Sequence, residues 1–167
     1  SAEKSTREKI LAAACALLEG ESAEAVTMAR IARAAGISRQ AVYLHFRTRA
    51  ELLVAVAHWL DVENDVDARL AESRGAETGE ARLTAFVAAW TGYIPLTHAA
   101  ARALRAAQET AEAAREAWTD RLRAIRHGCL AAAEALARDG RLASHLEAEQ
   151  AADLLSALLS LETWERL

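Results

Sequence analysis

The chain has 167 residues, 53% of them hydrophobic, which is enough apolar material to bury a real core in one or two domains. Its single proline and seven glycines leave few of the signals that mark strands and turns, so an almost entirely helical fold is expected. The formal net charge is −4 at pH 7, yet residues 1–50 carry +3 and the remainder −7, so the positive field lies on one segment and suits a polyanionic partner.

No apolar run is long enough to span a membrane, and no signal peptide with an apolar core and a cleavage site is evident. Cys15 and Cys129 lie within apolar helical patterns, which favours small buried thiols over a disulfide. We therefore expect a cytoplasmic protein in reducing surroundings.

The first predicted helix begins at Ser5 or Thr6, with Glu8 in its first turn and Gly20 at its end, and residues 1–4 are expected to be loose. This helix has one face to bury, because its apolar residues recur at helical spacing. The stripe consists of Ile10, Ala14, Leu17 and Leu18.

The segment TMARIARAAGISRQAVYLHFRTR, which begins at Thr27, predicts two short helices joined by a glycine turn. Thr27 and Ser38 can cap the two helices by accepting amide hydrogen bonds, and Gly36 supplies the left-handed backbone of the turn. Val42 and Phe46, four residues apart, face inward. This is the layout of a helix-turn-helix, whose second helix enters the major groove of DNA. The side chains left pointing outward are Arg39, Gln40, Tyr43 and Leu44.

The charge of this segment agrees with DNA binding. No acidic residue occurs between Glu24 and Glu51, whereas the interval holds five arginines. The alternative is a solvated helix pair inside an ordinary helical domain, but the acid-free run and the aromatic ending Tyr43-x-His45-Phe46 favour a nucleic-acid surface. The arginines are Arg30, Arg33, Arg39, Arg47 and Arg49.

Thr48 can cap the next helix with Glu51 three residues further on, and the apolar stripe that follows predicts a rod reaching about Ser73. Residues 73–80 form the clearest linker, since they contain two glycines and no large apolar side chain. Beyond the linker, two helices are expected over residues 80–93 and 96–108.

Pro95 should separate these two helices, because proline cannot continue the amide ladder. A long helix over residues 110–137 follows, with Gly128 as a kink or a close-packing point, and it should end at Asp139-Gly140. Its heptad-like seam is fit to pack against another helix. The seam consists of Trp118, Leu122, Ile125, Cys129, Ala132 and Leu136.

The last helix is expected to begin at Glu147 and to end with Trp164. Leucines at positions 154, 155, 158, 159 and 161 surround most of its circumference. One side can pack within its own domain, and a partner subunit is the simplest cover for the other. Because the sequence reaches Leu167 without a helix cap, we expect a further C-terminal element.

With Thr27, Ile31-Ala32, Ala35-Gly36-Ile37-Ser38 and Tyr43-x-His45-Phe46 in place, the stretch 5–60 resembles the DNA-binding domain of the TetR family of transcriptional regulators. The resemblance implies an all-α fold with an N-terminal three-helix helix-turn-helix DNA-binding domain and a C-terminal helical ligand-binding and dimerisation domain. We place the first in residues 1–50 and the second in 51–167, with 51–73 as the connecting helix. The rest of the chain resembles the family only in its helices, its proline-broken pair and its leucine-rich last helix.

The resemblance further implies a homodimer on a pseudo-palindromic operator, usually a repressor that a small-molecule effector releases. Carried over position by position, it implies phosphate contacts by Thr27, Ser38, Tyr43, His45 and Arg49. It also implies that Arg39 and Gln40 read base edges, where arginine can pair with guanine O6 and N7 and glutamine with adenine N6 and N7. The family most often has lysine at position 49 and often a small residue at position 40, so the base preference should be particular to this chain. The alternative for these side chains is a solvated surface, a core tyrosine at position 43 or a local cap at position 45.

An effector cavity is suggested by four tryptophans among few aromatics, three of them on adjacent predicted helices. For each candidate the alternative is ordinary core packing. The candidates are Trp59, Phe86, Trp90, Tyr93, His98, Arg105, Gln108, Trp118, Arg121 and Cys129.

No metal set is expected, because His127 and Cys129 point to different sides of a helix and no carboxylate spacing completes a site with His98. No nucleophile, phosphate loop or paired acid stands out, so neither a cofactor nor an enzymatic activity is expected.

We expect regulation by a population shift, in which the effector binds the DNA-incompetent form more tightly than the competent one. The alternative function is an all-helical interaction or scaffold protein whose basic head binds DNA weakly and without sequence preference.

Overall fold

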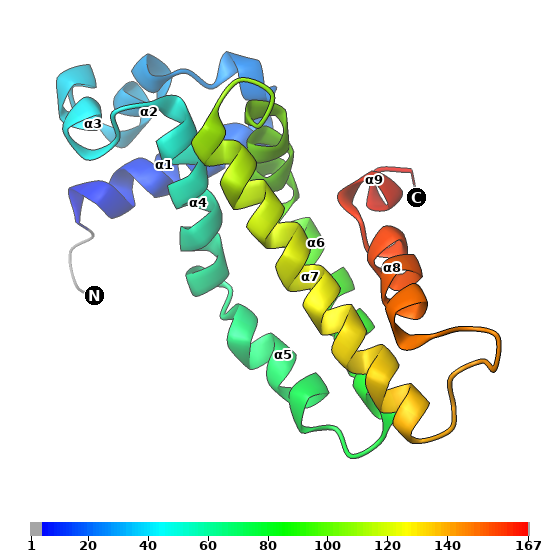
Figure 1. Ribbon diagram of the computed structural model, residues 1–167. Coiled ribbons are helices and arrows are strands. Elements are labelled where there is room, and N and C mark those ends of the chain that lie inside the picture. The colour runs from blue at the N-terminus through cyan, green and yellow to red at the C-terminus, as the bar shows by residue number, and fades with distance from the viewer. Residues whose placement is uncertain (1–4, 167) are drawn as a thin grey trace. The chain divides into compact units, whose positions relative to one another are not determined.

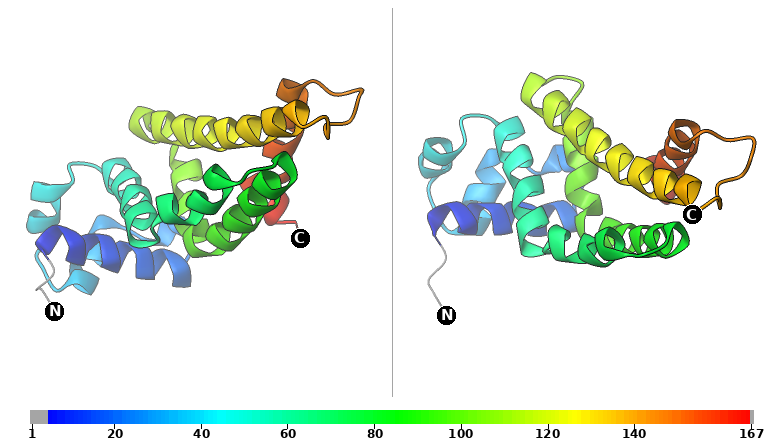
Figure 2. Two further views of the ribbon diagram at one scale, coloured as in Figure 1. Left: turned by 90° about the horizontal axis from the view of Figure 1, so that it is seen from below. Right: turned by 60° about the horizontal axis from the view of Figure 1, so that its bottom comes forward.

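The structure is a computed structural model that describes residues 5–166, so the expectations for residues 1–4 and for the end at Leu167 lie outside the described part. Every regular element in that part is a helix, which confirms the all-α prediction (Figures 1 and 2). The elements are α1 (Thr6–Gly20), a 3₁₀ turn η1 (Ala23–Ala25), α2 (Met28–Ala35), α3 (Arg39–His45), α4 (Arg49–Glu63), α5 (Val66–Gly75), α6 (Gly79–Ala107), α7 (Glu112–Arg138), α8 (Ala148–Leu158) and α9 (Leu161–Trp164).

The described residues form two compact units. We call residues 5–63 with 97–118 the head unit, and residues 64–96 with 119–166 the tail unit. Helices α6 and α7 each contribute to both units. These units describe packing, and the functional division at residue 50 stays a prediction.

The head unit is built on α1, which contacts both α2 and α4, while α2 contacts α3. Helix α1 begins as predicted, because the Ser5 hydroxyl accepts the Glu8 amide at 3.2 Å and the Glu8 carboxylate accepts the Ser5 amide at 2.7 Å. Its apolar side is fully buried at Ile10, Leu11 and Ala14. The same core takes side chains from the other three helices: Ile31, Val42, Phe46, Leu52, Leu53 and Val56.

The predicted rod from Thr48 to Ser73 is wrong, because α4 ends at Glu63 and α5 begins at Val66. Asp65 breaks the helix with φ +46, and its carboxylate accepts the Ala68 amide at 3.2 Å to cap α5. Aspartate tolerates the left-handed region and offers the backbone a side-chain acceptor in place of a helical carbonyl, so it favours a break here.

The predicted interruption at Pro95 is also wrong, because α6 runs without a break from Gly79 to Ala107. Proline removes one amide hydrogen bond, but the side chains around it are held by packing. Tyr93, Ile94 and Thr97 are all at most 6% exposed. Burial of side chains along α6 from Phe86 to Leu104 therefore outweighs the local cost of the proline.

The tail unit has an apolar core built from α6, α7 and α8 together with Leu159, which follows α8. Its buried members are Phe86, Cys129, Ala152 and Leu159. The Phe86 ring lies where a side chain at Gly128 would point, since a Cβ atom there would come within 2.6 Å of the ring. Gly128 is therefore a close-packing point, one of the two roles predicted for it.

The last predicted helix begins after Glu147, as expected, but it ends at Leu158. Ser160 interrupts it, because its hydroxyl accepts the Thr163 amide at 3.2 Å and starts the short helix α9. The seam predicted on α7 is buried at Trp118, Cys129 and Ala132, whereas Leu122 is exposed.

Candidate nucleic-acid interface

Two hydroxyl caps and one glycine shape the turn between α2 and α3. Thr27 accepts the Arg30 amide at 3.3 Å, and Ser38 accepts the Ala41 amide at 3.1 Å, so both predicted caps are confirmed. Gly36 has φ +69 and ψ +30, the left-handed conformation that the turn was predicted to need. Because each cap uses only an oxygen lone pair, both O–H groups remain able to donate to an anion.

Helix α3 has one buried and one exposed side. Val42 and Phe46 are 0% and 3% exposed, as predicted, and they fix α3 on the head unit. The first turn presents Arg39 and Gln40 to the outside, together with the remaining outward residues of the helix: Tyr43, Leu44 and His45. The predicted DNA-binding residues on α3 are therefore all accessible.

Arg39 and Tyr43 form a pair along this surface. The guanidinium carbon lies 5.5 Å from the centroid of the tyrosine ring, and Arg39 Nη2 donates to the Tyr43 hydroxyl at 3.3 Å. The two residues are four apart, so they are neighbours on one helix face. The contact restricts the long arginine side chain before any ligand binds, which reduces the entropy lost on binding.

Arg49, predicted as a phosphate contact, is held by the backbone of the segment before α2. Its Nε donates to the carbonyl of Val26 at 3.0 Å and its Nη2 to the carbonyl of Ala23 at 2.5 Å. The guanidinium has five N–H groups, so these two bonds leave donors for a phosphate. Nearby, the pKa of Glu24 is lowered by hydrogen bonds from its own backbone amide and the Ser22 side chain, and further by the charges of Arg102 and Arg49.

The arginines of the acid-free stretch are not equally available. Arg30, Arg33 and Arg47 are all exposed, but Arg30 pairs with Glu21 at 2.5 Å, which offsets its charge. Arg7 adds a cation near the end of α3 that the helix-turn-helix motif did not indicate. Its guanidinium carbon lies 5.0 Å from the centroid of the Phe46 ring. Its contact spans 39 residues, so no local pattern predicts it.

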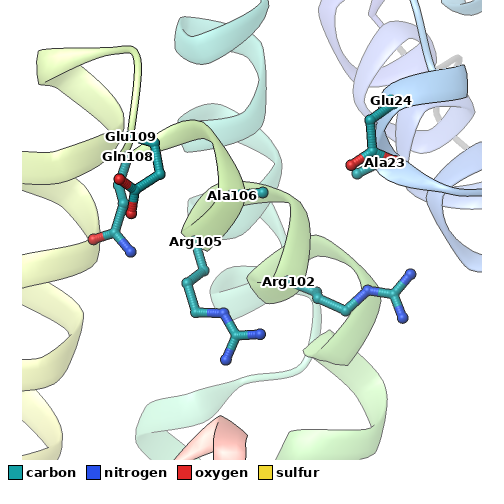
Figure 3. A pocket seen from close by; sticks show the side chains of 7 residues that line it. All are labelled: Ala23, Glu24, Arg102, Arg105, Ala106, Gln108 and Glu109. Atoms are coloured by element: carbon teal, nitrogen blue, oxygen red, sulfur yellow. The ribbon is translucent and has the colours of Figure 1, made fainter.

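The head unit also has a polar surface pocket of about 450 Å³ between η1 and the end of α6 (Figure 3). Arg102 and Arg105 leave the same stretch of α6, with Gln108 and Glu109 at its end and Glu24 on η1. Of the predicted effector residues, it contains Arg105 and Gln108. This pocket is charged rather than aromatic, unlike the cavity that the sequence suggested.

The aromatic effector candidates gather in the tail unit. The rings of Phe86 and Trp90 are stacked with their centroids 6.5 Å apart, and the ring centroids of Trp90 and Tyr93 are 5.6 Å apart. Arg121 lies 5.8 Å from the Tyr93 ring centroid and donates to its hydroxyl at 3.4 Å. Cys129 is fully buried beside this group, and burial raises the pKa of its thiol.

Five effector candidates belong to the head unit instead: Trp59, His98, Arg105, Gln108 and Trp118. Trp90 also donates its indole N–H to the carbonyl of Leu159 at 3.2 Å, so this aromatic group is tied to the end of α8. Among the described residues, no group of three histidine, cysteine or carboxylate side chains could hold a metal ion. No described helix is both long and apolar enough to cross a membrane.

Residues 10–56 match the family model described as bacterial regulatory proteins, tetR family. None of the curated proteins matches the chain. Among solved structures, a transcriptional regulator from Pseudomonas aeruginosa PAO1 has a TM-score of 0.77 at 24% identity, with 96% of this chain and 77% of that chain covered. One from Rhodococcus sp. Rha1 has a TM-score of 0.69 at 27% identity, with coverage of 93% and 80%. The regulator FadR from Bacillus subtilis, solved in complex with stearoyl-CoA, has a TM-score of 0.75 at 16% identity, with coverage of 95% and 87%.

Proposed function

This chain belongs, through its N-terminal segment, to the TetR family of bacterial regulatory proteins, and from that premise we propose that it is a repressor released from a palindromic operator by a small-molecule effector. The observation that carries the proposal is the accessible side of α3. Arg39 and Gln40 stand in its first turn, and no acidic residue lies between positions 24 and 51 to repel DNA. As a regulator of transcription, the protein would act in the cytoplasm.

We assign base reading to the first turn of α3. Arg39 can donate to guanine O6 and N7, and Gln40 can pair with adenine N6 and N7, each worth about 1–3 kcal/mol of discrimination. The stacking of Arg39 on Tyr43 supports this assignment, because it presents the guanidinium in a restricted orientation.

We assign phosphate binding to groups that surround this reading surface. The free O–H groups of Thr27 and Ser38 and the hydroxyl of Tyr43 can donate to phosphate oxygens, as can His45 and the unused N–H groups of Arg49. Such contacts fix the register of the protein on the duplex and carry no sequence information themselves.

We propose a homodimer, since two recognition helices about 34–36 Å apart read successive half-sites of a palindrome. The outer side of α8 supports a subunit contact in the tail unit. Leu154 and Leu158 are 56% and 67% exposed there, one helical turn apart, and a second copy of α8 would cover them.

We place the effector site at the aromatic group Phe86, Trp90 and Tyr93, with Arg121 and Cys129 beside it. The candidates Trp59, Arg105 and Trp118 belong to the head unit and stay predictions outside this site. The aromatic rings suit an apolar ligand body, and the Arg121 guanidinium suits an anionic group on it. To act as a switch, the effector must bind the DNA-incompetent form more tightly.

The direct experiment is a selection of genomic DNA fragments with purified protein, repeated with candidate anionic apolar ligands. We expect enrichment of fragments that share a palindrome, and loss of that enrichment with the effector. Binding that is weak and equal for all fragments would instead support a scaffold protein with non-specific DNA affinity.

A further inference from the structure

Leu44 lies in the last turn of α3, on the exposed side of this helix. It is 82% exposed, which makes it the most exposed large apolar side chain among the described residues. It follows the fully buried Val42 by two residues, or about 200° around the helix, so it points almost directly away from the core. A leucine in this place buries little apolar surface within the described chain.

The surroundings of Leu44 point to DNA as its partner. Gln40 lies one turn earlier on the same face, Tyr43 precedes Leu44 in the chain with Arg39 over its ring, and no acid lies nearby in the sequence. An apolar contact between protein subunits would bring this basic, acid-free surface against another copy of itself, which like charges disfavour. Duplex DNA complements the charge and offers one apolar group in its major groove, the 5-methyl group of thymine.

We propose that Leu44 is a specificity residue that recognises thymine through its 5-methyl group. This inference rests on the proposed function of α3 as a DNA-reading helix. The other bases present polar edges at this depth of the groove, and a leucine would desolvate them without a hydrogen bond in return.

The helix geometry also places the thymine. Gln40 and Leu44 are separated by about 6 Å along the helix axis, and base pairs rise by about 3.4 Å. The thymine should therefore lie within about two base pairs of the adenine that Gln40 reads, which predicts two nearby A·T pairs in each half-site.

Deoxyuridine substitution tests this inference, because it removes only the methyl group. After the operator has been selected with the wild-type protein, each thymine of a half-site is replaced in turn and the affinity is measured. We expect the wild-type protein to bind the operator about three- to fivefold more weakly when uracil replaces thymine at one particular position. This is the effect of losing one buried methyl group. Leu44→Ala should show no difference between thymine and uracil at that position, whereas Leu44→Met should keep it.

Val62→Ala is the matched control, because Val62 is an apolar side chain of α4 that is 77% exposed. This variant should retain the wild-type thymine-to-uracil ratios. If the ratio of affinities for thymine and uracil were the same in wild type and Leu44→Ala at every position, the inference would be overturned. The proposed regulator function would still stand, because an operator had been selected. A change in the oligomeric state of Leu44→Ala with unchanged ratios would overturn it too, by assigning Leu44 to a protein contact. Failure to select any operator would instead overturn the proposed function.

Discussion

At the scale of single residues, α3 separates base reading from phosphate binding. Arg39→Ala should relax specificity at one base pair, lowering the affinity for the operator by about 1–3 kcal/mol relative to an operator changed at that position. Competition binding against the four possible base pairs measures this loss. Equal losses on operator and random DNA would show that Arg39 contributes only charge.

Arg49 should have two roles, contact with DNA phosphates and support of the backbone before α2. Substitution by alanine and by lysine should distinguish the two. Arg49→Ala should weaken binding to all DNA and flatten the salt dependence by about one unit. Arg49→Lys should preserve the salt slope because it keeps the charge, yet lower the free energy of unfolding, since one ammonium group cannot reproduce the fork that joins the Ala23 and Val26 carbonyls. Urea denaturation and salt titrations measure the two effects, and a fully stable Arg49→Lys protein would contradict the structural role.

Cys15 should be a slow nucleophile although it is only half-buried. Its pKa is raised to about 11 by burial, and further by the charge and hydrogen bond of Glu19. Because the folded pKa lies above the ordinary thiol value, little thiolate exists at pH 8, and the alkylation rate should keep rising tenfold per pH unit past pH 9. Glu19→Gln should increase the rate at pH 8, and a rate that levels off near pH 9 would contradict the shift.

Sequence reasoning finds site residues whose chemistry is local. Thr27, Gly36 and Ser38 were predictable because a cap or a turn involves only the next few residues. The carbonyl partners of Arg49 were not, since they lie 23 and 26 residues away. The position of such a side chain depends on how separate helices pack, which a linear pattern does not contain.

At the scale of elements, the predicted helix ends were right where the capping residues and the apolar period indicated the same boundary. They were wrong where a local capping or breaking residue indicated a boundary and the apolar period continued past it. The breaks at Asp65 and Ser160 were missed, because an apolar period that continues past a break hides a capping residue within it. The opposite error occurred at Pro95, where a strong local breaker lies in a helix that buried neighbours hold together. In both cases the sequence shows a local preference to break the helix and an apolar face that favours its continuation, but not which of the two is larger in free energy.

Two helical glycines should respond in opposite ways to alanine. Gly128→Ala should lower the free energy of unfolding, because overpacking against the Phe86 ring costs about 1–3 kcal/mol and exceeds the gain in helix propensity of about 1 kcal/mol. Gly92→Ala is the control, since nothing lies within 4 Å of its added Cβ atom, and it should stabilise by about 0.5–1 kcal/mol. Urea melts of both variants test this, and stabilisation by Gly128→Ala would contradict the close packing.

At the scale of the whole molecule, the proposed function needs two copies of the chain. Leu158→Glu should place a charge in the proposed α8 contact and shift the sedimentation coefficient from that of a dimer to that of a monomer. Binding to a full operator should weaken, whereas binding to a half-site should persist. Val62→Glu alters an apolar residue of α4 that is even more exposed, at 77% against 67% for Leu158, and this variant should remain a dimer. A dimeric Leu158→Glu protein would move the subunit contact elsewhere.

The charge distribution of the chain also belongs to this scale. A net charge of −4 opposes contact with DNA except through the segment where acids are absent, so the orientation of the protein on the duplex should be set by residues 25–50. This much was predictable from composition alone. The residues Phe86, Trp90, Tyr93 and Arg121 were all named from the sequence as effector candidates. The contact of Arg121 with the Tyr93 ring was not, because it depends on the packing of α6 against α7.

The central claim is that the exposed side of α3 reads the sequence of DNA. Its most direct test is the ratio of affinities for the selected operator and for random duplex at physiological salt, measured for wild type and for the double variant Arg39→Ala, Gln40→Ala. We predict a wild-type ratio of at least about 10³ that falls by one to three orders of magnitude in the variant, with much smaller change on random DNA. A wild-type ratio near one, or an equal ratio in both proteins, would contradict the claim.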